Sequence, residues 1–126
     1  MTPLLLASRK TFDTWRTKYG FEIVGDDGNS RSMYSSVSLV RSSLRIDFSW
    51  DGLEGELAVT LQAAGGRAVN LEDVVHLADG AGLSLRRIRR GATSGMLETR
   101  LRKIASLLEA DAKELLELGE EGPLQD

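Results

Sequence analysis

The sequence predicts an α+β fold: an N-terminal helix, a four-stranded antiparallel β-meander, and two C-terminal helices packed on the apolar face of the sheet. Three observations predict it. Apolar residues recur at helical spacing near the start of the chain and over about 95–118. After a short candidate strand at 21–24, apolar and polar residues alternate from 33 to 62, as in strands with one solvated face. Glycines separate these runs where turns are expected.

The first helix is expected at about residues 3–19. Thr2 supplies an N-cap hydroxyl, and Pro3 fits the first turn, where its missing N–H is not needed. Gly20 is the expected left-handed stop. An aromatic stripe on one face of this helix is formed by Phe12, Trp15 and Tyr19. Because such stripes usually pack against other elements, we interpret it as part of the core.

The strand register follows from keeping all apolar residues on one face. Pairing Trp50 with Leu57 satisfies this condition for the last two strands. Pairing Leu39 with Leu44, across a turn at 41–42, satisfies it for the preceding pair. The opposite face would then be polar and would show Ser36, Ser38, Arg45, Asp47, Ser49, Thr60 and Gln62.

The C-terminal half is expected to contain two helices. Asn70 is the candidate N-cap of the first. The second spans about 95–118, with Thr93 or Ser94 as its N-cap. The pattern over 81–92 fits a short strand, a turn or a helix, and these alternatives stay open.

Length and composition indicate a single domain over 1–119, followed by an acidic tail at 120–126 that is expected to fray. The chain has 126 residues and no cysteine, so disulfides and thiolate chemistry are excluded. No apolar run approaches the ~20 residues that a membrane span needs. We therefore expect a cytoplasmic protein that does not enter a membrane.

The formal net charge of −3 conceals a strong segregation of charge along the chain. Residues 86–103 hold seven bases and one acid, whereas residues 104–126 hold one base and seven acids. Such segregation bears on partners more than on the fold. The expectation is a charged surface that binds another molecule.

Motifs for catalysis are absent from the sequence. It contains no phosphate-binding loop, no dinucleotide fingerprint and no zinc-protease motif. The single histidine, His76, is expected on the solvated side of a helix. Glu72 and Asp79 lie within about one turn of it, so a carboxylate–imidazole pair is the alternative. We predict that the protein is not an enzyme and has no catalytic, cofactor-binding or metal-binding residues.

Candidate partner-binding residues fall into two charged groups. The acidic group lies around the last strand turn and consists of Asp47, Asp51, Glu54 and Glu56. The basic group consists of Arg86, Arg87, Arg89 and Arg90. The acidic group would bind a basic protein and is slightly preferred. The arginines would form a protein interface or pair with acidic groups of the same chain.

The alternative for the basic segment 86–103 is a nucleic-acid-associated regulator, since phosphate contacts dominate such affinity. Two observations argue against nucleic acid as the partner. The sequence pI is about 5.2, and no aromatic residue is interleaved with the arginines for base stacking.

Three stretches of the chain are similar to small stand-alone proteins of high-GC, actinobacterial-type bacteria. They are Tyr19-Gly20-Phe21, the meander from Tyr34 to Leu61 with its Asp51-Gly52 and Gly55-Glu56-Leu57 turns, and the leucine-rich last helix. Some of these proteins are immunity proteins encoded beside secreted toxins. The resemblance covers about residues 12–118. It implies a non-catalytic inhibitor that neutralises a partner toxin by direct binding. An edge strand such as 21–24 leaves a monomer or a homodimer as the expected state.

Overall fold

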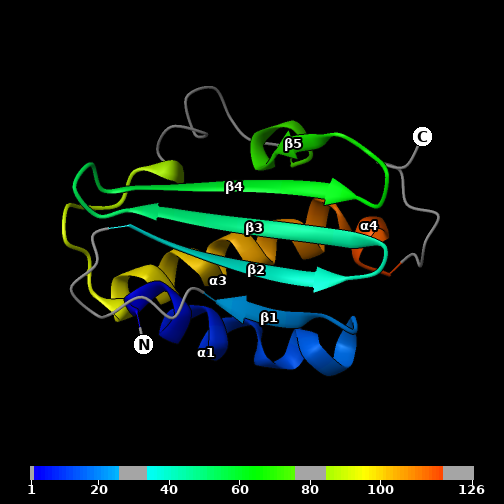
Figure 1. The fold of residues 1–126 in the computed structure, drawn as a ribbon, viewed down its shortest axis with the longest axis horizontal. Coiled ribbons are helices and arrows are strands. Elements are labelled where there is room, and N and C mark those ends of the chain that lie inside the picture. The colour runs from blue at the N-terminus through cyan, green and yellow to red at the C-terminus, as the bar shows by residue number, and fades with distance from the viewer. Residues whose placement is uncertain (1, 26–33, 76–84, 118–126) are drawn as a thin grey trace.

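The computed structural model describes residues 2–25, 34–75 and 85–117 of the chain. Its elements are α1 (Pro3–Lys18), β1 (Glu22–Gly25), β2 (Tyr34–Arg41), β3 (Leu44–Asp51), β4 (Glu56–Ala63), β5 (Ala68–Asn70), the 3-10 helix η1 (Leu71–Asp73), α3 (Ser94–Asp111) and α4 (Lys113–Glu117). The strands form one antiparallel sheet in the order β1-β2-β3-β4-β5. Figure 1 shows α1 and α3 behind this sheet, so the described helices cover one face. The predicted α+β architecture is confirmed.

The sheet has five strands, and the prediction of four is wrong. The additional strand, β5, pairs Ala68 with Gln62 and Asn70 with Thr60. A turn at Gly65, where φ is +77°, returns the chain alongside β4. Three residues are too few to display a period of two, which is why the alternation did not reveal this strand.

The second predicted helix differs from what the described residues show. Asn70 precedes only the one-turn helix η1, and its side chain makes no capping hydrogen bond there. The remainder of this predicted helix from residue 76 onward, including His76, lies outside the described residues. The same holds for residues 81–84 and for the acidic tail at 120–126.

Helix α1 begins and ends as its sequence predicts. The Thr2 hydroxyl accepts a hydrogen bond from the Leu5 N–H at 3.2 Å, and Gly20 has a φ of +77°. The Phe12 ring lies 5.3 Å from the Phe48 ring of β3, centroid to centroid. Because both side chains are fully buried, the aromatic stripe is part of the core.

The β3–β4 register is as predicted, with Trp50 opposite Leu57. The predicted β2–β3 register is wrong by two residues: Leu39 lies opposite Ile46, and Arg41 lies opposite Leu44. The turn therefore lies at 42–43. A shift of two residues keeps every side chain on its face, so the apolar pattern alone did not distinguish the two registers.

The last predicted helix is divided in two. Of the two predicted N-cap candidates, Thr93 caps α3 by accepting a hydrogen bond from the Met96 N–H at 3.3 Å. The helix then breaks at Ala112, where φ is −127° and ψ is 26°. The adjacent residues Leu115 and Leu116 of α4, which follow the break, are both buried.

Arg41, at the end of β2, holds α4 in place. Its guanidinium donates hydrogen bonds to the carbonyls of Leu115, at 2.7 Å, and Leu116. It also donates to the Tyr19 carbonyl at 2.9 Å and stacks on the Phe21 ring, 4.9 Å from its centroid. Burial lowers the pKa of Arg41, but guanidinium remains protonated in proteins. One side chain thus links β2, α4 and the end of α1.

None of the helices in the described part of the chain combines the length and apolar character needed to cross a membrane.

Candidate functional site

The face of the sheet turned away from α1 and α3, here called the open face, carries polar and small side chains. The residues predicted for it all lie there by register: Ser36, Ser38, Arg45, Asp47, Ser49, Thr60 and Gln62. Tyr34, Val40, Asp51, Glu56 and Ala58 share the same face. In the view of Figure 1, the described helices do not cover it.

Asp47 lies in the middle of the open face and is held by its neighbours. It accepts hydrogen bonds from the Ser38 hydroxyl and from Arg45 Nε, the latter at 2.8 Å. The Asp47 side chain is only 32% exposed. Through these contacts Asp47 contributes locally to the pairing of neighbouring strands. It is separate from the other acidic candidates, which lie at the hairpin between β3 and β4.

The other three acidic candidates belong to the acidic hairpin, residues 51–56, which joins β3 to β4. Asp51 Oδ1 accepts hydrogen bonds from the N–H groups of Leu53, at 3.0 Å, and Glu54, at 3.1 Å. This arrangement stabilises the turn. Gly55 completes it with a φ of +71°, a conformation that favours glycine.

The arginine segment, residues 86–90, packs against the acidic hairpin. The Ile88 N–H donates a hydrogen bond to the Gly55 carbonyl oxygen at 2.8 Å. The preceding residue, Arg87, forms an isolated antiparallel β-bridge with Glu56. The Arg87 and Glu56 side chains form an ion pair at 3.7 Å. The structure therefore brings the two candidate groups together at one end of the sheet, where they partly neutralise each other. Both side chains are substantially exposed, so the pair itself contributes little stability.

The basic candidates differ in their surroundings. Arg86, Arg89 and Arg90 are exposed. Arg100, from α3, donates hydrogen bonds to the carbonyls of Leu85 and Arg87, the latter at 2.9 Å. Several bases of the segment 86–103 thus support the fold of the segment itself.

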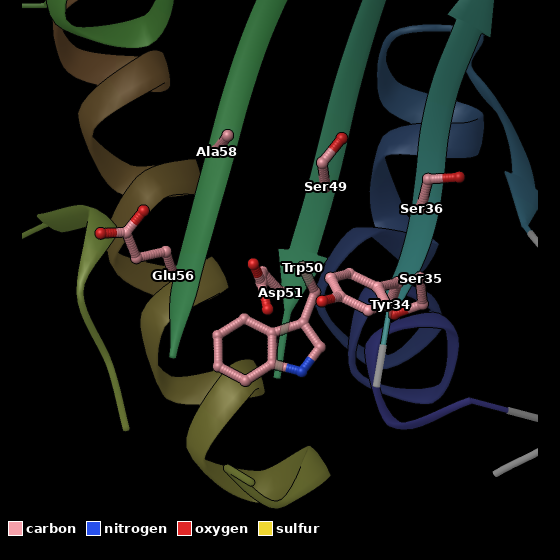
Figure 2. Close-up of a pocket in the computed structure, with 8 residues that line it drawn as sticks. All are labelled: Tyr34, Ser35, Ser36, Ser49, Trp50, Asp51, Glu56 and Ala58. Atoms are coloured by element: carbon pink, nitrogen blue, oxygen red, sulfur yellow. The ribbon is translucent and has the colours of Figure 1, made fainter. Parts of the chain in front are cut away.

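A hollow of about 380 Å3 lies on the open face beside the acidic hairpin. Figure 2 shows the short side chains of Ser36, Ser49 and Ala58 lined up across β2, β3 and β4. Tyr34 and Asp51 lie at one end, and the Tyr34 ring extends from β2 toward Asp51. Tyr34 is 57% exposed.

Sequence reasoning missed this hollow as a site. The signal was present, because the register places three small residues in one row across neighbouring strands. The neighbouring row on the same face begins with Tyr34, which lies opposite Asp51, so an aromatic ring and a carboxylate stand beside the small residues.

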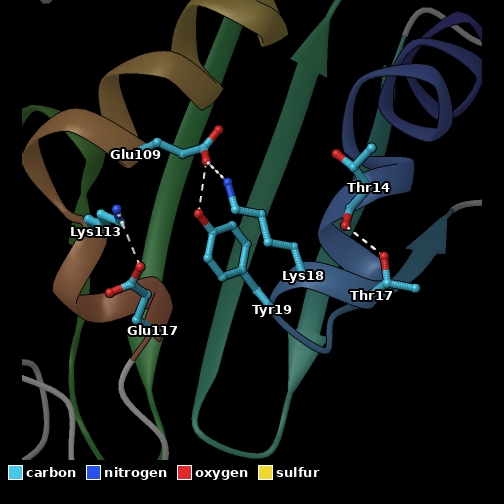
Figure 3. A network of polar contacts seen from close by, with 7 residues as sticks. All are labelled: Thr14, Thr17, Lys18, Tyr19, Glu109, Lys113 and Glu117. Carbon is cyan, nitrogen blue, oxygen red and sulfur yellow. Dashed lines mark hydrogen bonds and ion pairs between the residues drawn. The ribbon is translucent and has the colours of Figure 1, made fainter.

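A second polar cluster joins the C-terminal end of α1 to α3. Glu109 Oε2 accepts hydrogen bonds from Lys18 Nζ at 2.7 Å and from the Tyr19 hydroxyl at 2.8 Å (Figure 3). The Lys18 hydrogen bond holds the pKa of Glu109 below its ordinary value, and the Tyr19 hydrogen bond acts in the same direction against partial burial. The bond to Glu109 raises the pKa of Lys18, while burial raises that of Tyr19.

These shifts predict how stability depends on pH. Because the folded pKa of Glu109 is depressed, its contribution is present above its ordinary value of 4.5 and is lost as pH falls through the folded value. The pKa values of Lys18 and Tyr19 are raised in the folded protein. Their contributions to stability are therefore present below about pH 10 and are lost above it.

We therefore expect Glu109→Gln to lower the urea midpoint at pH 7 and to have a smaller effect at about pH 3, where a larger fraction of the Glu109 carboxylate is protonated. Urea unfolding of both proteins at the two pH values measures this difference. Glu117→Gln, which removes an exposed 3.5 Å pair with Lys113, is the matched control. An equal effect of Glu109→Gln at both pH values would contradict the assignment.

No group of three or more acidic or histidine side chains among the described residues could hold a metal ion. His76 lies outside the described part, so its predicted position on a helix surface stays a prediction.

In comparison with known proteins, no family model, no curated protein and no solved structure matches this chain.

Proposed function

We propose that the protein is a non-catalytic binding module that recognises a basic partner protein through the open face and the acidic hairpin. The observation that carries the proposal is the one-sided covering of the sheet by α1 and α3 (Figure 1). The face that the described helices leave uncovered has a hollow with a floor of small side chains, bordered by the exposed Tyr34. Aromatic residues are enriched at protein interfaces.

Charge favours a basic partner over an acidic one. Asp47, Asp51 and Glu56 share the open face with Arg45, and Glu54 adds an exposed carboxylate to the adjoining hairpin. Complementary charge speeds association and selects among partners. The arginine segment lies beside this surface and would border the partner.

In its concrete form, the proposal is an immunity-type inhibitor that acts in the cytoplasm and neutralises a toxin by direct binding. Its support is the resemblance of the sequence pattern to such proteins, together with a surface suited to a basic cleft. The alternative, a nucleic-acid-associated regulator, has weaker support. Arg87, Arg100 and Arg102 are already engaged by Glu56, backbone carbonyls and Glu98 respectively.

The experiment is co-expression with the product of the adjacent gene, followed by calorimetric titration of the purified partners. We expect a stable complex, and we expect Ser49→Arg on the open face to weaken it at least about tenfold by adding bulk and like charge. Ser106→Arg is the matched control, because Ser106 is exposed on α3, on the helical side.

Three results would contradict the proposal. Lack of a complex would remove the immunity-type role, and equal affinities for the two variants would remove the open face as the site. Salt-sensitive retention of DNA or RNA by the purified protein, with no protein partner, would favour the nucleic-acid alternative.

A further inference from the structure

The hollow on the open face is rich in hydrogen-bond acceptors. The hydroxyls of Ser36 and Ser49 lie along it, and the Asp51 carboxylate lies at one end (Figure 2). Hydroxyl and carboxylate oxygens accept hydrogen bonds, so a ligand that donates hydrogen bonds would be favoured here.

The negative charge of the hollow comes mainly from Asp51. Its Oδ1 atom accepts the two hairpin N–H groups, and no hydrogen bond within the described residues engages Oδ2. Glu56 also lines the hollow, but its carboxylate points toward the arginine segment, in agreement with its ion pair with Arg87. A ligand cation would therefore be held at the Asp51 end.

The Tyr34 ring gives the hollow a planar wall. The ring extends from β2 toward Asp51, while Ser36, Ser49 and Ala58 keep the floor low (Figure 2). A planar cation can stack on such a ring and hydrogen-bond to the neighbouring carboxylate at the same time. Guanidinium does both, and it carries five donors and no acceptor.

We infer that this hollow binds the guanidinium group of an arginine side chain on the basic partner. The inference rests on the proposed function and names the group that the open face recognises. Lysine fits less well, because its ammonium group is a compact point charge that is strongly hydrated and cannot stack as a plane. Arginine is also enriched among the residues that dominate interface energies.

The inference is tested by titrating the ¹⁵N-labelled protein with N-acetylarginine amide and following the backbone amide resonances. We expect saturable shifts at Ser36, Ser49 and Ala58, with a dissociation constant in the range of about 1–10 mM, as is reasonable for a single side chain. The citrulline analogue has the same shape without the charge, and it should produce no saturable shift. The lysine analogue should bind more weakly than the arginine probe.

Two variants and one control locate the binding. Asp51→Asn keeps an oxygen that can accept the hairpin hydrogen bonds, and it should weaken binding about fivefold or more by removing the charge. Tyr34→Leu should weaken it about threefold through loss of the cation–π contact. Asp13→Asn, on the exposed surface of α1, removes the same charge far from the hollow and should leave binding unchanged.

Equal binding of the citrulline analogue, shifts centred elsewhere, or equal weakening by Asp13→Asn would overturn the inference. Since the probe is a small molecule, its result is independent of the partner. If the adjacent-gene product binds but the arginine probe does not, only this inference fails. If the probe binds but no protein partner does, the proposed function fails and the guanidinium site stands.

Discussion

Arg41→Ala is expected to lower the free energy of unfolding by about 3 kcal/mol, because hydrogen bonds from a charged donor contribute about 1.5–3 kcal/mol and several are lost together. The substitution leaves the carbonyls of Leu115 and Leu116 without their guanidinium partner at the end of α4. It also removes the stacking on Phe21 and the link to the Tyr19 carbonyl. Urea unfolding followed by far-ultraviolet circular dichroism measures the loss.

Two further variants separate geometry from charge. Arg41→Lys keeps the charge but replaces a planar fork by a single ammonium, so it should recover less than about half of the lost stability. Arg16→Ala removes an exposed arginine that forms only a long ion pair of 3.9 Å with the exposed Asp13 among the described residues, and it should change stability by less than about 0.5 kcal/mol. If Arg41→Ala were as mild as Arg16→Ala, α4 would not depend on this contact.

Gly55→Ala is expected to destabilise the protein by about 3 kcal/mol through two effects that act together, backbone strain and a steric clash. Gly55 has a φ of +71°, where a β-carbon is strained. An added β-carbon would also lie 2.7 Å from the carbonyl carbon of Arg89 and 2.8 Å from the nitrogen of Arg90. Both are backbone atoms, so the arginine segment itself would have to move.

Gly65→Ala is the matched control for this variant. Gly65 has a φ of +77°, but an added β-carbon would meet no described atom within 4 Å. It should therefore cost only the strain, about 1 kcal/mol. Urea unfolding gives the difference between the variants, and hydrogen exchange at the Ile88 N–H, which donates to Gly55, should be faster in Gly55→Ala alone. Equal losses for the two variants would show that the close approach does not matter.

The sequence was a reliable guide to which face of a strand is buried and to where the long helices begin. Alternation over β3 and β4 predicted their register correctly, because a slip of one residue would expose the whole apolar set. Local chemistry alone predicted Thr2 as the N-cap of α1 and narrowed the N-cap of α3 to Thr93 or Ser94. In both cases the information lies within a few residues of the feature it determines.

The errors arose where the apolar pattern does not distinguish the alternatives, or where packing between distant segments decides the outcome. The β2–β3 register differs by two residues, a change that preserves faces and is invisible to the apolar pattern. The strand β5 is too short for periodicity and exists because β4 offers it an edge. The short helix α4 contacts Arg41, which is far away in the sequence.

The candidate site, too, could be predicted from the sequence only in part. The charges of the acidic hairpin and the arginine segment could be read from the chain, and so could the polar character of the open face. Their contact, through the Ile88–Gly55 hydrogen bond and the Arg87–Glu56 pair, could not. The sequence predicted the acidic and basic residues as two separate candidate groups and left pairing within the chain as an alternative. In the structure the two groups are neighbours.

What the sequence by itself determined is the α+β class, the buried side of β2, β3 and β4, and the N-terminal ends of the two long helices. These depend on periodicity and on short-range hydrogen bonds, which are encoded locally. Only the tertiary structure decided the fifth strand, the placement of α4 and the hollow beside Tyr34. The fifth strand has too few residues to show a period of its own and needs the edge of β4 for pairing. The placement of α4 and the hollow depend on residues that are distant in the sequence and become neighbours only when the chain has folded.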